Sequence, residues 1–369
     1  MAQGRREIAL ALAGGNALGA YGAGAYEALH DRGYAPDFVS GASIGAVTGG
    51  IIAGNVPAQR VDKLREFWRQ AAVGSAFGLA PAAGKSRETY NLMHALQTLV
   101  MGRPGLFKPR LPGLISIFPG MPPDVALFDS QPLISTLQRV IDFDLLNAAV
   151  VPLIIGTVDM QNGDPVFFDT RQTKLLPLHF LATTAFTPGF PPVEIDGRLL
   201  GDPGLISNLP VDALLDPPPP HDLLCFAVDL FDAVGDRPYS LDTGLERAQD
   251  IVFSAQALRT LDARGREHRL RNIIHELSRH IPPDHRTGRA AVLAAEGRAN
   301  QITTVLIAYR ARSHEVSAKT VDFSRASIDG RWTAGLENMN AAIDKLEAGS
   351  ATAAGHGYSF FDCRTARYS

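Results

Sequence analysis

The chain of 369 residues has few of the features that build disulfide frameworks, metal centres or membrane spans. Its two cysteines, Cys225 and Cys363, lie far apart in the sequence, which gives no metal-ligand spacing and fits a reducing compartment. No apolar run approaches the roughly 18 to 20 residues of a membrane span. The formal net charge is −3, and it gives no reason to expect a nucleic-acid partner. We therefore expect no metal and no nucleic acid.

The chain does contain many short apolar runs. Its hydrophobic content is 46%, which is enough for a large core. The runs alternate with helix-like segments over the first 230 residues, and this alternation predicts a mainly parallel sheet covered by helices. We expect residues 1–230 to form one α/β unit with strands near Ile8–Leu12, Phe38–Ala42, Val151–Val158 and Leu223–Leu230.

Ser43 lies in the sequence Gly41-Ala42-Ser43-Ile44-Gly45, between a strand-like and a helix-like segment. This pattern predicts a nucleophile elbow, a tight turn that exposes a serine hydroxyl. Gly41 and Gly45 supply the unhindered backbone that such a turn needs. The amide of Ile44 at the helix start can stabilise a developing oxyanion. The alternative is a glycine-rich turn with an incidental serine.

A second glycine-rich turn contains Gly14, Gly15 and Asn16 and follows the first apolar run. Its small residues leave backbone amides accessible to an anion, so we predict that these three residues supply an oxyanion hole. The glycine spacing fits no dinucleotide fingerprint, and the Gly-Lys-Ser/Thr ending of a phosphate loop is missing. We expect no cofactor. The alternative is a turn that only packs a helix closely on a strand.

Asp202 lies in Gly201-Asp202-Pro203-Gly204 and is followed by Asn208-Leu209-Pro210. The order of glycine-rich loop, Gly-x-Ser-x-Gly, aspartate turn and Asn-x-Pro over residues 7–212 resembles patatin-like phospholipases, as does the Thr-containing stretch 182–192. The resemblance implies a three-layer, patatin-like and lysophospholipase-like α/β fold with a mainly parallel central sheet. It also implies a catalytic dyad of Ser43 and Asp202 acting on lipid or other acyl esters.

Three positions depart from the family pattern. Asn16 replaces a glycine but keeps its amide and tolerates positive φ. Leu18 stands where the family often has a cation. Pro203 follows Asp202, removes an amide donor and favours an extended backbone at Asp202. These departures leave room for a catalytically impaired lipid-binding protein, while an intact acyl-enzyme also serves an acyltransferase or thioesterase.

Histidines that follow Asp202 raise the question of a triad, since nucleophile, acid and histidine is the chain order of α/β-hydrolases. His221 adjoins a run of four prolines, and His275 and His280 fall in a polar helical stretch. We expect all three to be exposed, so that the dyad acts without histidine.

Residues 103–123 form a proline-broken insertion that is both apolar and basic. This composition suits a lid or an interfacial loop, with Arg103, Lys108 and Arg110 meeting lipid phosphates. The alternatives are a loop packed on the core and a contact between protomers of a homo-oligomer. The sequence thus predicts a cytoplasmic protein with a peripheral contact at the inner face of the membrane as one interpretation.

Residues 231–369 differ in pattern from the first unit. Charged helical periodicity covers Leu245–His280 and Ala290–Ala299, a strand-like run covers Thr303–Tyr309, and a further helix ends near Leu346. This part resembles the C-terminal extension of a bacterial patatin-like subgroup. We expect a mostly helical region that packs on the catalytic domain, with Phe323, Ile328 and Trp332 as packing residues.

Overall fold

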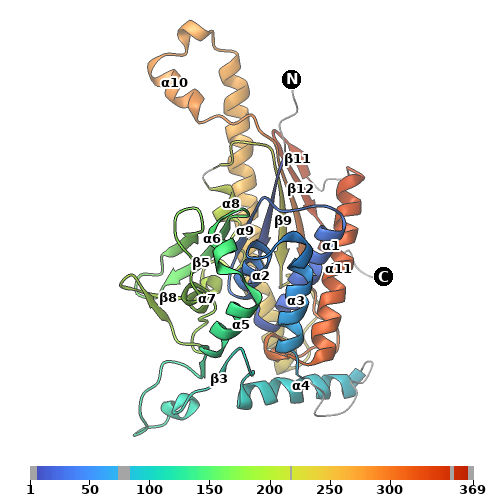
Figure 1. Ribbon diagram of the computed structural model, residues 1–369. Helices are drawn as coiled ribbons and strands as arrows, with labels where there is room; N and C mark the ends of the chain where they lie inside the picture. The colour runs from blue at the N-terminus through green and yellow to red at the C-terminus, as the bar shows by residue number, and fades with distance from the viewer. Residues whose placement is uncertain (1–5, 74–83, 217, 350–352, 365–369) are drawn as a thin grey trace.

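One sheet of ten strands organises the molecule, and the computed structural model describes residues 6–73, 84–216, 218–349 and 353–364 (Figure 1). The sheet order is β11-β12-β10-β9-β1-β2-β5-β8-β7, with β6 paired to β5. Its parallel centre consists of β12 (Tyr358–Asp362), β10 (Ile302–Ala308), β9 (Leu223–Asp229), β1 (Glu7–Leu12), β2 (Phe38–Gly41) and β5 (Leu153–Asp159).

The central strands match the apolar runs because both faces of the sheet are covered. Every residue of β5, β9 and β10 is buried, as parallel strands between helical layers require. The antiparallel edges are short: β6 (Pro165–Asp169), β7 (Val193–Ile195), β8 (Arg198–Gly201) and β11 (Ala353–Gly355), with a separate pair of β3 (Lys108–Pro109) and β4 (Phe128–Asp129).

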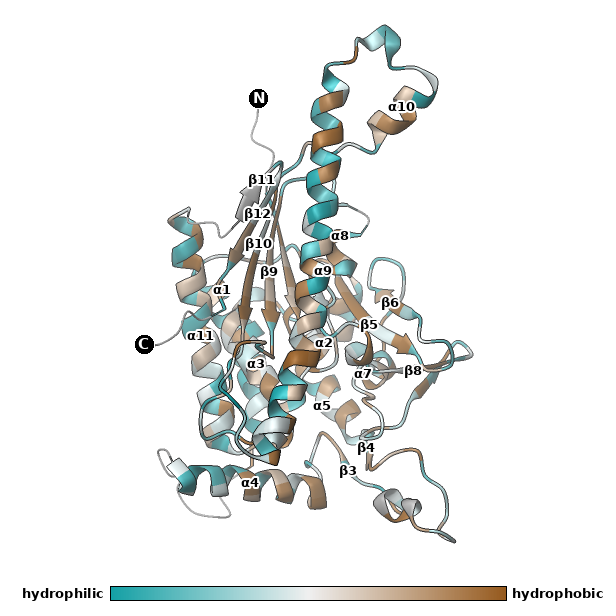
Figure 2. Cartoon of the chain, turned by 180° about the vertical axis from the view of Figure 1, so that it is seen from behind, coloured by the Kyte–Doolittle hydropathy of each residue, from teal (hydrophilic) through white to brown (hydrophobic). Residues whose placement is uncertain are grey.

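Helices cover both faces and complete the three layers expected from the sequence. Figure 1 shows α1 and α11 in front of the sheet, and Figure 2 shows α9 on the opposite face. The helices are α1 (Ala20–Asp31), α2 (Ile44–Ala53), α3 (Pro57–Ala71), α4 (Gly84–Met101), α5 (Pro132–Val140), α6 (Phe143–Asn147), α7 (Pro177–Thr183), α8 (Asp212–Leu215), α9 (Leu241–Arg279), α10 (Gly288–Ala295) and α11 (Arg325–Glu347). Short 3₁₀ turns are η1 (Asn16–Gly19), η2 (Gly113–Ile117), η3 (Pro203–Leu205), η4 (Pro283–His285) and η5 (Ser317–Val321).

The region after residue 230 joins the same core. Strand β10 pairs in parallel with β9, and β12 extends the sheet beyond it. Helix α11 lies so close to α1 that a Cβ on Gly335 would meet the Tyr21 carbonyl oxygen at 1.9 Å. Phe323, Ile328 and Trp332 are buried here, as expected of packing residues.

Helix α9 extends beyond the body of the molecule. Its 39 residues correspond to roughly 58 Å at 1.5 Å per residue. The half near its C-terminus, together with α10, forms a projecting arm (Figures 1 and 2). None of the described helices has the length and apolar character needed to cross a membrane.

Candidate active site

Ser43 occupies the sharp turn between β2 and α2. Its φ of 52° and ψ of −126° lie outside the regions that non-glycine residues favour, a strain typical of functional turns. The turn needs both flanking glycines. A Cβ on Gly41 would meet the Ala46 amide nitrogen at 2.5 Å, and one on Gly45 would meet the Leu12 carbonyl oxygen at 2.2 Å. The pattern around Ser43 therefore folds as an elbow that presents its hydroxyl.

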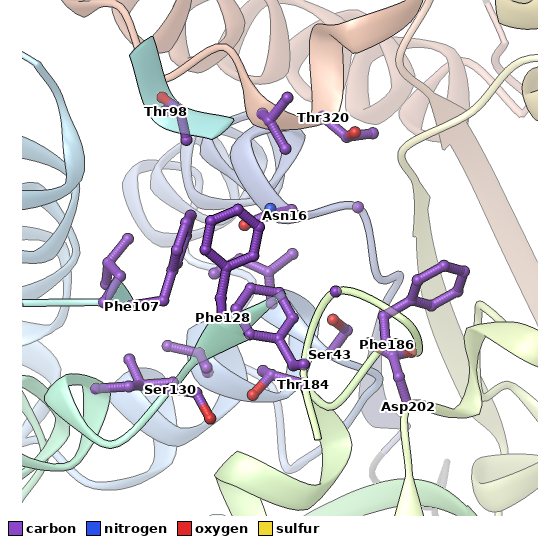
Figure 3. Close-up of a pocket in the computed structure, with 18 of the residues that line it drawn as sticks. Asn16, Ser43, Thr98, Phe107, Phe128, Ser130, Thr184, Phe186, Asp202 and Thr320 are labelled. Carbon is purple, nitrogen blue, oxygen red and sulfur yellow. The ribbon is translucent and has the colours of Figure 1, made fainter. Parts of the chain in front are cut away.

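Asp202 follows β8, and its side chain lies beside that of Ser43 at the cavity (Figure 3). Its side chain is almost completely buried. Burial raises the pKa of the Asp202 carboxyl to about 7, although hydrogen bonds from Ser43 and the Gly204 amide partly offset that rise. A carboxylate with such a pKa is a better proton acceptor at neutral pH than an ordinary aspartate.

Pro203 does not move Asp202 away from Ser43. Asp202 has the extended backbone that a following proline favours, with φ −64° and ψ 128°. Pro203 is the first residue of η3, where the missing amide leaves no hydrogen bond unmade. The Gly204 amide donates to Asp202 Oδ1 at 2.8 Å instead. The aspartate turn thus accommodates the departure from the family pattern.

Three of the four predicted oxyanion amides are free to bind an anion. Within the described chain, the amides of Gly15, Asn16 and Ile44 donate to no acceptor. Asn16 has φ 52°, a value that asparagine tolerates. Gly15, Asn16 and Ile44 also line the cavity that contains Ser43.

The prediction for Gly14 needs correction, because its amide already donates to the Asn208 carbonyl oxygen at 3.1 Å. Gly14 instead makes room for the nucleophile. A Cβ there would lie 2.9 Å from the Cβ of Ser43 and 2.7 Å from Asn208 Oδ1. Leu18 is fully buried, so it serves the core at the position where the family often has a cation.

Two further residues hold the site together, and sequence reasoning did not select them. Asn208 Nδ2 donates to the Gly14 carbonyl oxygen at 3.0 Å, so the glycine loop and the aspartate turn are joined by two hydrogen bonds. Thr183, the last residue of α7, accepts a hydrogen bond from the Ser43 amide. Both residues fall within the family-like stretches, and that position was the only signal available for them.

An apolar cavity of about 260 Å³ opens in front of Ser43 and Asp202. Its walls include the aromatic rings of Phe107 and Phe128 (Figure 3) and of Phe190. The three rings pack against one another with centroids 5.0 to 5.8 Å apart. A water-poor cavity of this kind suits an acyl chain and strengthens electrostatic interactions with a developing charge.

Residues 103–123 divide between this cavity and the surface. Leu106 and Phe107 are buried and line the cavity. Leu111 and Phe118 are exposed. No described histidine lines the cavity; His221 and His280 are exposed and His275 is half-buried. The described residues also contain no cluster of histidine, cysteine and carboxylate side chains that could hold a metal ion.

Comparison with family models shows to which protein family the chain is related. The model described as patatin-like phospholipase matches residues 10–215. The chain belongs to the patatin-like phospholipase family. A second model, described as patatin phospholipase, matches residues 251–351, which begin within α9 and extend past the end of α11. Family membership supports a hydrolase that acts on the acyl groups of lipids.

Other comparisons add little to this assignment. No curated protein matches the chain. Among solved structures, the crystal structure of VipD from Legionella pneumophila is similar at 13% sequence identity and a TM-score of 0.39, covering 92% of this chain and 67% of that chain.

Proposed function

We propose that the protein is a serine acyl hydrolase that cleaves lipid esters with Ser43 and Asp202 as its catalytic dyad. The observation that carries the proposal is the strained elbow of Ser43 against the buried carboxyl of Asp202, at an apolar cavity. Such an arrangement supports nucleophilic catalysis because the base, the nucleophile and the substrate space meet at one point.

In the first step, the Ser43 hydroxyl oxygen attacks the ester carbonyl carbon while its proton passes to the Asp202 carboxylate. The carbonyl oxygen gains the negative charge, which the amides of Gly15, Asn16 and Ile44 stabilise. Collapse of the tetrahedral intermediate breaks the bond to the alcohol, and Asp202 returns the proton to the departing oxygen. The product is an acyl-Ser43 ester.

In the second step, Asp202 takes a proton from a water molecule as the water oxygen attacks the acyl-enzyme carbonyl. The same amides hold the second oxyanion. Cleavage of the bond to Ser43 releases the carboxylic acid, and the proton on Asp202 returns to the serine oxygen. If an alcohol or thiol replaces water, the same acyl-enzyme makes the protein an acyltransferase.

A thioesterase would use the same chemistry on a thioester in place of an ester. The cytoplasmic location expected from the sequence also stays a prediction. The reading as an impaired lipid-binding protein is weakened by two observations. Pro203 leaves Asp202 beside Ser43, and the Asn16 amide faces the cavity without an acceptor in the described chain.

Labelling with a fluorophosphonate probe tests the proposal. Peptide mass spectrometry of the wild-type protein should locate the label on Ser43, and Ser43→Ala should abolish it. Ser130 lines the same cavity, so Ser130→Ala is the matched control and should label normally. Failure of the folded wild-type protein to label, with and without lipid vesicles, would favour the impaired lipid-binding protein instead.

Turnover of ester substrates separates the enzymatic alternatives. Ser43→Ala and Asp202→Asn should each reduce kcat by on the order of 10³-fold or more, because each removes a member of the catalytic unit. Product analysis in water and with added alcohols or thiols then distinguishes hydrolysis from acyl transfer. An Asp202→Asn protein with unchanged kcat would remove Asp202 from the mechanism.

A further inference from the structure

The outer face of α4 is apolar over its last three turns. From Asn91 to Met101 the helix contains no Asp, Glu, Lys or Arg. Its inner face packs on the body, while the outer face exposes the side chains of Leu92, Met93, Leu96, Val100 and Met101. A surface helix ordinarily places polar residues outward. The side chains of Val100 and Met101 are 71% and 67% exposed. Because an exposed apolar face of this kind marks an interaction site, we expect it to bind an apolar partner.

The loop between β3 and β4 continues this surface. An ion pair closes its base, since Arg110 Nη2 and Nε donate to Asp124 at 2.9 and 3.1 Å. Beyond that pair the loop exposes the apolar side chains of Leu111, Ile115, Phe118, Met121 and Val125. Helix α4 contacts β3, and both views place α4 and this loop at the same end of the molecule (Figures 1 and 2).

Each of the three cations that the sequence offered to lipid phosphates has a partner in the protein, and burial removes one of them, Arg103, from contact with lipid. Arg103 is buried and donates twice to the Ala71 carbonyl oxygen. Lys108 lies 3.4 Å from Asp129, and Arg110 is held by Asp124. The pairing with Arg110 lowers the pKa of the Asp124 carboxyl to about 2, so this pair persists through the neutral pH range. Apolar contact is therefore the main source of attraction that this surface offers to lipid.

The apolar surface is continuous with the cavity of Ser43. Leu99 of α4 is 42% exposed and also lines the cavity. On the side of the loop, Leu106 and Phe107 line the cavity just before β3. A lipid chain leaving an apolar phase at this surface would therefore meet mainly apolar side chains on its way to the dyad.

We propose that α4 and residues 110–125 dock on the surface of a lipid bilayer by apolar insertion, independently of anionic head groups. The proposal rests on the lipid hydrolase function proposed above, and it assigns to α4 the entry of substrate. Exposed Leu, Val, Phe and Met side chains supply the binding free energy because they leave water for the acyl region. Electrostatic attraction contributes less than apolar contact, since Lys108 and Arg110 are paired with carboxylates and Arg103 is buried.

Binding of the full chain to vesicles tests this docking surface. The vesicles consist of phosphatidylcholine alone, or phosphatidylcholine with phosphatidylglycerol, at low and high salt. The variants are Leu96→Ser with Val100→Ser on α4, and Phe118→Ser with Met121→Ser on the loop. Neither pair lines the cavity. Leu270→Ser with Leu277→Ser on the α9 arm is the matched control, because these leucines are 61% and 63% exposed.

We expect the wild-type protein to bind phosphatidylcholine vesicles with little dependence on salt. Each variant pair of the docking surface should weaken that binding on the order of tenfold, and the control pair should bind normally. Unchanged binding of both surface variants would overturn the proposal. Binding that requires phosphatidylglycerol and disappears at high salt would overturn it as well, in favour of electrostatic attraction.

Two controls separate this proposal from its alternatives. Sedimentation velocity reveals whether the α4 variant converts a dimer to a monomer without altering vesicle binding, a result that would make the face an interface between two copies of the chain. Hydrolysis of a water-soluble short-chain ester should be the same in the wild type and the surface variants and absent in Ser43→Ala. Ester hydrolysis without vesicle binding would reject the docking surface alone, whereas vesicle binding without any Ser43-dependent hydrolysis would count against the proposed function.

Discussion

The backbone amide of Ser43 donates to the hydroxyl oxygen of Thr183 at 2.9 Å, across 140 residues of sequence. Thr183 is fully buried, and its own hydroxyl donates to the Gly156 carbonyl oxygen at 2.6 Å. The hydroxyl thus joins the strained turn to β5, which contains Gly156. Because a strained backbone persists only where its surroundings fix it, this hydrogen bond holds the nucleophile in position.

Replacing Thr183 by valine should lower kcat by about 10- to 100-fold, because the elbow loses an acceptor and a misplaced nucleophile reacts slowly. KM should change little, since Thr183 does not line the cavity. Thr183→Ser keeps the hydroxyl and should restore most of the rate. Steady-state kinetics of the two variants measure the effect. A serine variant as slow as the valine variant would assign the loss to packing and not to the hydrogen bond.

The pH dependence of turnover should report the pKa of Asp202. The mechanism needs the carboxylate form, and burial raises the pKa of Asp202 to about 7. We therefore expect kcat/KM to fall as the pH decreases below about 7 and to level off above it. A profile of kcat/KM for a soluble ester between pH 5 and 9 checks this. A rate that stays constant down to pH 5 would mean that Asp202 has an ordinary pKa.

Asp202 should also reduce the stability of the protein at the pH where it works. Its pKa is about 7 in the folded chain and 3.8 for an unperturbed aspartate, so between these values the folded state binds up to one more proton than the unfolded state. The free energy of unfolding therefore decreases as the pH rises from about 4 to 7. Asp202→Asn removes this cost and should stabilise the protein by on the order of 4 kcal/mol at pH 8. The difference in thermal midpoint from the wild type should shrink toward pH 5; a difference that does not vary with pH would exclude a raised pKa.

The main strands of the fold could be predicted because they are buried on both faces. Uninterrupted apolar runs are the signature of such strands, and β1, β2, β5 and β9 fall within one or two residues of the predicted ranges. The strand β8 was not predicted, since Arg198-Leu199-Leu200-Gly201 is short and half exposed. Short, partly exposed strands such as β8, which lies between β5 and the edge strand β7, carry too little hydrophobic pattern to be recognised from sequence.

The candidate site was predictable only where its function depends on local backbone. Gly41 and Gly45 are adjacent in sequence to the turn that they permit, so the elbow of Ser43 could be recognised. The bond from Asn208 to Gly14 spans 194 residues, and sequence contains no sign of which carbonyl accepts the Gly14 amide. Gly14 was therefore assigned to the oxyanion hole, although its amide is already engaged.

Gly45 and Gly22 both lie close to Leu12 in the fold, but substitution by alanine should have opposite effects on stability at the two positions. A Cβ on Gly45 would lie 2.2 Å from the Leu12 carbonyl oxygen and 2.6 Å from that of Ala13. Neither backbone atom can yield without displacing β1, so Gly45→Ala should prevent folding or abolish turnover. On Gly22, inside α1, the nearest atom to a Cβ is Leu12 Cδ2 at an ordinary 3.7 Å.

Gly22→Ala should therefore keep full activity and gain about 0.5 to 1 kcal/mol of stability, because alanine loses less conformational entropy than glycine in a helix. Thermal unfolding monitored by circular dichroism and turnover of a soluble ester measure both variants under the same conditions. An active, stable Gly45→Ala protein would show that the elbow and β1 can separate by several tenths of an ångström. The close packing of α2 on β1 would then not be what holds Ser43 in its strained conformation.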